Sequence, residues 1–112
     1  MIAILGIDGL EYEYVIEFEC THLMQKSFGK TDISLFSTPL TVVLWTSFLT
    51  GRNTEKEVPA DPWSFRVSPE ETFFSYFEQW KAIDVPGFTY DTEKHARERE
   101  LMRKYFYGEA DI

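Results

Sequence analysis

The chain has 112 residues, enough for one domain with a single modest core, and its 44% hydrophobic content favours folding over disorder. A formal net charge of −8 repels polyphosphate backbones and argues against a nucleic-acid partner. The lone cysteine excludes an internal disulfide, and the N-terminus lacks the basic region of a signal peptide. No apolar run reaches the roughly 20 residues of a membrane helix. The sequence therefore predicts one cytoplasmic domain over residues 1–112, with no membrane partner.

The first part of the chain predicts a strand, a helix and a second strand. Residues 1–8, MIAILGID, form an apolar run followed at once by Gly9, a pattern typical of a strand buried on both faces. Apolar residues then recur at nearly helical spacing among glutamates, which predicts an amphipathic helix that stops near Gly29. Residues 31–37, TDISLFS, alternate well enough to form the second strand.

The most apolar stretch, TPLTVVLWTSFLTG, predicts a helix from about Thr41 to Thr50. Gly51 follows it and suits the left-handed conformation that often ends a helix. Trp45 and Phe48 lie four and seven residues beyond Thr41, and we expect both to point inward. The stretch also holds four threonines and a serine, so the sequence raises the question of which hydroxyl does chemistry.

The second half continues with a loop and two further helices around a third strand. Ser68, Pro69 and Glu71 suit the cap, first and third positions of a helix with an aromatic inner face formed by Phe73, Phe74, Phe77 and Trp80. Residues 81–85, KAIDV, predict a short strand, and residues 91–108 predict a helix whose strong apolar positions come late. This alternation predicts an α/β fold with helices layered on a mainly parallel sheet.

Two positions at the expected strand ends are candidate site residues. In open parallel sheets ligands bind beyond the carboxyl ends of the strands, so Asp8 and the loop before Thr41 are expected at the same crevice. A carboxylate at Asp8 would face a cation or, alternatively, cap the next helix or satisfy its own turn. Thr41 lies at an expected helix N-terminus, which favours an anion, and the alternative is an ordinary helix cap. A threonine hydroxyl needs a base or a metal to become a nucleophile.

Together, ILGIDGLEYEYV and STPLTVVLWTSFLTGRN resemble the N-terminal part of the type I phosphodiesterase/nucleotide pyrophosphatase family, in the alkaline phosphatase superfamily. The resemblance covers residues 1–54 with motifs and, more loosely, FFSYFEQWKAIDVPGFTYD. It implies a partial alkaline-phosphatase-like core in which Asp8 ligates one of two divalent metals, zinc or manganese. Thr41 would then be the nucleophile and a metal ligand, acting on a phosphate-ester small molecule.

Family members run several hundred residues and supply further Asp and His ligands later in their chains. This chain has only two histidines, so we expect it to be a truncated segment, incomplete as a catalyst alone. A homo-oligomer or a companion polypeptide is the expected partner. Asp91 and His95 have the Asp-x-x-x-His spacing of the family's second metal site, and the alternative is that they begin a solvated helix.

A hypothesis of another class is a non-catalytic α/β domain that binds a protein partner or forms an oligomer. Its docking surface would be the late aromatic tail at Tyr105, Phe106 and Tyr107.

Overall fold

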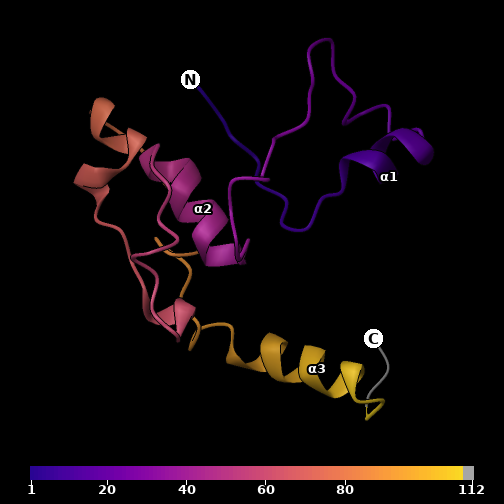
Figure 1. Ribbon diagram of the computed structural model, residues 1–112, viewed down its shortest axis with the longest axis vertical. Coiled ribbons are helices and arrows are strands. Elements are labelled where there is room, and N and C mark those ends of the chain that lie inside the picture. Colours follow the sequence, from indigo (N-terminus) through magenta and orange to yellow (C-terminus); the bar gives the residue numbers. More distant parts are fainter. Residues whose placement is uncertain (110–112) are drawn as a thin grey trace. The chain divides into compact units, whose positions relative to one another are not determined.

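The computed structural model describes residues 1–109, which divide into two compact units, one of residues 1–35 and one from Phe36 onward. The helical elements, drawn in Figure 1, are two short or medium helices, a series of single 3₁₀ turns and a C-terminal helix. The bounds are α1 Tyr12–Glu17, α2 Thr41–Thr50, η1 Pro62–Ser64, η2 Pro69–Glu71, η3 Phe73–Tyr76 and α3 Ala96–Phe106. No helix among these residues is long and apolar enough to cross a membrane.

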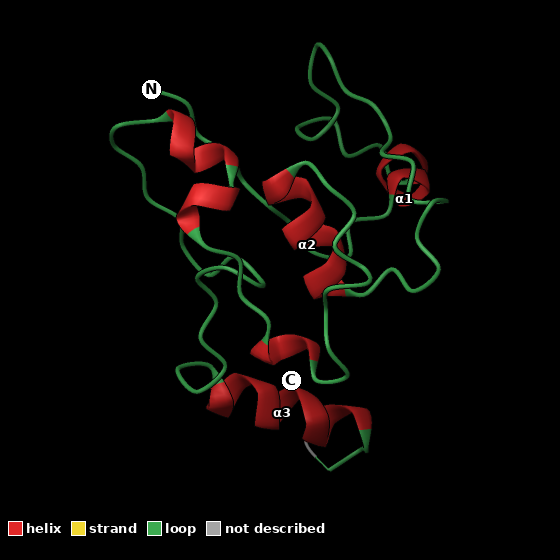
Figure 2. Ribbon diagram, turned by 60° about the vertical axis from the view of Figure 1, so that its left-hand side comes forward, coloured by secondary structure: helices red, strands yellow, loops and turns green. Residues whose placement is uncertain are grey.

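The predicted α/β fold is wrong, because residues 1–109 contain no β-strand (Figure 2). The three segments expected as strands, residues 1–8, 31–37 and 81–85, are all irregular or turn-forming. A strand forms only when a neighbouring strand pairs with its backbone N–H and C=O groups, and apolar composition alone cannot supply that neighbour. Accordingly Ile2 and Leu5, expected to be buried on the sheet, are 75% and 86% exposed.

The N-terminal unit is organised around α1, which is much shorter than the helix expected to reach Gly29. The ring of Tyr12 stacks on that of Phe28, with centroids 6.3 Å apart, and the Lys30 ammonium lies 5.6 Å from the Tyr12 ring. Lys30 also pairs with Glu13 at 3.2 Å across an exposed surface. These contacts hold the loop after α1 against the helix. Among the described residues of this unit, Val15 is the one buried apolar residue.

The C-terminal unit is built on α2, as the sequence predicts. Gly51 ends the helix at φ 72°, the left-handed conformation expected of it, and its N–H bonds to the Ser47 carbonyl at 2.9 Å. The buried face of α2 includes Val42, Val43 and Leu49. Trp45 is half-buried, and Phe48 is 54% exposed, so the expectation that Phe48 points inward is wrong.

The helix expected after Ser68 is replaced by the two turns η2 and η3. The capping interaction predicted at its start still forms. The Ser68 N–H and hydroxyl donate to the Glu71 carboxylate at 2.7 and 3.0 Å. Thr72 then turns to an extended backbone, and its hydroxyl both donates to Pro69 and accepts from Phe74. A competing cap at Thr72 therefore interrupts the helix after a single turn.

Candidate functional site

Most hydroxyls of α2 have structural partners. Thr46, fully buried, donates to the Val42 carbonyl at 2.7 Å, and its oxygen lies 2.7 Å from that of Thr54. Ser47 contacts the Thr54 hydroxyl and accepts the Thr54 N–H, both at 3.1 Å. Thr50 donates to the Thr46 carbonyl. This buried hydroxyl cluster ties the loop after α2 to the helix, because Thr54 would otherwise bury an unpaired polar group.

Thr41 stands apart from that cluster as the first residue of α2, half-buried, with Leu40 at the cap position. It is therefore not the helix cap, which was the alternative to a catalytic role. The N–H groups of a first helical turn have no acceptor within the helix, and the helix dipole favours an anion there. Within residues 1–109, no protein group forms a hydrogen bond with the Thr41 hydroxyl.

Asp8 lies in an exposed turn with Gly9, whose φ is 67°. It does not follow a strand, so the structural premise that would aim its carboxylate at a crevice is absent from the described chain. Asp8 belongs to the N-terminal unit and Thr41 to the C-terminal unit.

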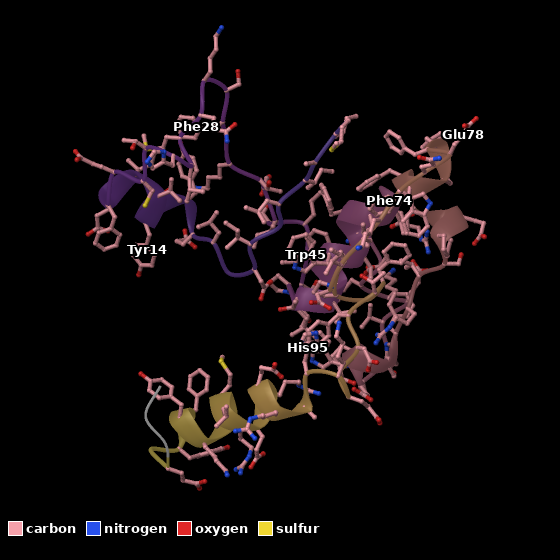
Figure 3. All side chains as sticks on the ribbon, turned by 180° about the vertical axis from the view of Figure 1, so that it is seen from behind. Tyr14, Phe28, Trp45, Phe74, Glu78 and His95 are labelled. Carbon is pink, nitrogen blue, oxygen red and sulfur yellow. The ribbon has the colours of Figure 1, made fainter. Side chains whose placement is uncertain are left out.

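The side chains of Asp91 and His95 contact different partners. Asp91 lies in the turn before α3, and His95, labelled in Figure 3, is the cap residue of α3. The Asp91 carboxylate accepts from the backbone N–H of Glu93 at 2.9 Å, which closes a turn before α3. The His95 ring stacks on Tyr90 at 4.7 Å, and its Nε2 lies 3.1 Å from the carboxylate of Asp84. The contacts of His95 anchor the start of α3 to the segment before it.

The described side chains do not fit a divalent metal. Residues 1–109 contain no group of three or more His, Cys, Asp or Glu side chains placed to hold one. A zinc or manganese site needs at least three protein donors, and a two-metal site needs more. No metal-binding site is therefore seen among the described residues, and a metal-binding hydrolase assignment finds no support in them.

A second feature of the C-terminal unit is a hollow of about 290 Å³ where the end of α2 meets η2 and η3. We call it the aromatic groove. Its lining residues are Phe48, Leu49, Thr50, Gly51, Glu70, Glu71, Thr72, Phe73, Ser75 and Tyr76. Phe48 packs edge-on against Phe73 at 5.6 Å, and Tyr76 is 88% exposed at the rim. The groove is therefore open, aromatic on its walls and acidic on one side.

Charge on that rim is only partly neutralised. Arg52 binds Glu57 through two hydrogen bonds and Glu71 through one at 2.7 Å. The guanidinium lowers the pKa of Glu57, while the Ser68 N–H and then Arg52 lower the pKa of Glu71. Glu70 forms no ion pair with any residue of 1–109, so Arg52, Glu57, Glu70 and Glu71 together carry a formal charge of −2.

Aromatic rings also join η3 to two later segments. Phe74, labelled in Figure 3, lies 4.9 Å from Trp80 and 5.6 Å from Phe88, ring centre to ring centre. The sequence predicted Phe74 and Trp80 on one helical face, and the structure brings them together through a turn instead. The groove itself was missed, because its walls come from α2 and η3 and no local pattern joins them.

Comparisons with known proteins give no match, whether with family models, with curated proteins or with solved structures.

Proposed function

We propose that the chain acts by association, docking α3 on another polypeptide. The observation that carries this proposal is the exposed apolar side of α3. Leu101, Met102, Tyr105 and Phe106 are 41%, 53%, 53% and 78% exposed, and no residue of α3 is buried. Four large apolar residues at helical spacing on one element form the kind of surface that marks a protein-binding site.

Total exposed area supports the same proposal. The chain exposes 9266 Å². Scaling for folded proteins gives about 6,400 Å² for one compact body of this mass, and about 7,600 Å² for two separate bodies of 35 and 77 residues. The remaining excess of roughly 1,600 Å² is about twice the roughly 800 Å² that one partner contributes to a standard protein interface.

Burial within the chain is correspondingly sparse. The buried apolar residues of the described chain are Val15, Val42, Val43, Leu49 and Val67. None of the nineteen aromatic residues is among them. Since aromatic side chains bring the largest apolar area to a core, a partner that covers them would add stabilisation that the chain lacks alone. We place this association in the cytoplasm, a location supported by the single, unpaired cysteine.

Photo-crosslinking in cells tests this proposal. A benzophenone analogue of phenylalanine at position 106 is expected to form a discrete adduct with one polypeptide, whereas the same analogue at exposed Tyr14, outside α3, is expected not to form that adduct. Absence of any adduct at position 106, together with a purified chain that stays monomeric, would refute the proposal.

A second candidate is a phosphodiesterase-like segment whose missing donors come from a companion polypeptide. It is favoured by Thr41, which lies in the first turn of α2 with its hydroxyl outside the buried hydroxyl cluster. The polypeptide captured at position 106 provides the test. Mixed with this chain, it should hydrolyse bis-p-nitrophenyl phosphate, with turnover lost in Thr41→Ala and kept in Thr41→Ser. Unchanged background hydrolysis in the mixture would eliminate this candidate.

A further inference from the structure

The association proposed above does not identify the surface that α3 binds. Resting on that proposed function, we infer that the partner is a second copy of this chain. The α3 helix of each copy docks in the aromatic groove of the other, so that the dimer contains the same contact twice.

The charge of α3 differs from that of the rest of the chain. Residues 94–107 hold five basic and two acidic side chains, whereas residues 1–93 hold six basic and fifteen acidic ones. The C-terminal helix is thus the basic element of an acidic chain. A surface that attracts it must be acidic, and other copies of this chain present such a surface.

One face of α3 carries both basic and apolar side chains. Arg97, Leu101, Lys104 and Tyr105 follow the i, i+4, i+7, i+8 spacing that places residues on one helical face. Arg97 has no ion-pair partner among residues 1–109, and Lys104 is only 3.8 Å from Glu100 on an exposed surface, a contact of little energetic weight. This face therefore combines available positive charge with apolar and aromatic surface.

The aromatic groove has the size and lining to receive this face of α3. About 290 Å³ lies at the lower end of small-ligand sites, and it suits one or two side chains better than a cofactor. Its walls include Phe48 and Phe73, which favour an aromatic guest, and its rim carries the carboxylate of Glu70 with no ion-pair partner among the described residues. Tyr105 with Lys104 beside it supplies the aromatic ring and the opposite charge.

Three binding partners can be compared: the same chain's own groove, an anionic membrane and a second copy. Within one chain, α3 contacts η1, where Arg99 lies 5.8 Å from the Trp63 ring. Figures 1 and 2 show α3 apart from α2, so it does not occupy the groove of its own chain. An anionic membrane would attract the basic face but repel the acidic remainder of the chain. A second copy satisfies both unpartnered surfaces at once, and the reciprocal contact closes into a dimer with two-fold symmetry.

Sedimentation equilibrium of the purified chain tests the inference. Concentration-dependent dimerisation that weakens with salt is expected. Glu70→Lys and Lys104→Glu should each weaken dimerisation about tenfold or more, because the dimer contains the altered contact twice. Glu78→Lys makes the same charge change on an exposed residue outside the groove lining and should leave dimerisation unchanged. Both groove and helix positions are on the surface, so circular dichroism should show an unchanged fold.

Mixing the two charge-reversed variants gives the decisive result. A heterodimer of Glu70→Lys with Lys104→Glu contains one native contact and one reversed but complementary contact. The mixture should therefore dimerise more strongly than either variant alone. Equal behaviour of Glu70→Lys and Glu78→Lys, or no recovery on mixing, overturns the inference. A monomeric purified chain that still forms an adduct at position 106 also overturns it, while leaving the proposed function standing.

Discussion

Replacing Gly87 with alanine tests how the C-terminal unit is packed. Gly87 is buried, has φ +72°, and its carbonyl accepts the Val67 N–H at 2.9 Å. A Cβ at this position would lie 2.2 Å from Cγ2 of Thr46 and 3.2 Å from Cγ1 of Val42. Both of these side chains are fully buried, so neither can swing away into solvent. The substitution must therefore push the loop away from α2.

Two costs combine in the magnitude. The left-handed conformation costs a non-glycine residue about 1–2 kcal/mol, and overpacking a filled core costs about 1–3 kcal/mol more. Gly87→Ala should therefore destabilise the protein by about 2–5 kcal/mol. Gly51→Ala is the matched control, because Gly51 has the same φ of +72° but no atom within 4 Å of its added Cβ. Only the backbone cost of about 1–2 kcal/mol is expected there.

Urea unfolding followed by circular dichroism measures both variants. The double variant Gly87→Ala with Thr46→Ser removes the clashing methyl group and keeps the buried hydroxyl, so its destabilisation should be less than the sum of the two single changes. Equal losses for Gly87→Ala and Gly51→Ala, or strictly additive losses in the double variant, would refute the close approach of this loop to α2.

Three further predictions follow from the same unit. Thr54→Val keeps the shape of a buried side chain but removes the hydroxyl shared with Thr46 and Ser47, and should lower the free energy of unfolding by about 1–3 kcal/mol in a denaturant titration. The pKa of Glu71 is lowered in the folded chain, so its contribution to stability is present above the unfolded pKa and is lost as pH falls through the folded pKa. An NMR titration should place its midpoint below that of glutamate in a model peptide, and Arg52→Gln should raise that midpoint; no change on substitution would contradict the ion pair. Asp84→Asn should weaken the contact with the His95 ring and increase hydrogen exchange in the first turn of α3 relative to its last turn, whereas uniform exchange would show that this contact does not anchor the helix.

Local signals were sufficient where one segment determines its own structure. The apolar run before Gly51 predicted α2 together with its left-handed end, because backbone hydrogen bonds within a helix and its terminal glycine involve only nearby residues. The Ser68 and Glu71 pairing was predicted for the same reason. The length of the helix expected after Ser68 was not predicted correctly, because the Thr72 hydroxyl offers the backbone a competing turn.

The candidate site was predicted less well than the helices. Asp8 and Thr41 were placed by assuming a sheet, and in the described residues that sheet does not exist. Asp91 was weighed as a possible helix start, but α3 begins at Ala96, and the Asp91 carboxylate acts in the turn before it. The aromatic groove could not be predicted, because Phe48 and Phe73 are 25 residues apart and only the turn at Thr72 brings their rings to 5.6 Å.

What the sequence alone determined is therefore the position of α2, its glycine end, the capped turn at Ser68 and the basic, late-apolar character of the C-terminal helix. Each depends on residues within a few positions of one another, where propensity and capping act directly. Tertiary structure decided whether the apolar run at residues 1–8 became a strand, which way Phe48 faced, and which glycine is sterically required. Those outcomes depend on atoms from distant segments, as when Gly87 meets Thr46, and no local pattern in the chain encodes that contact.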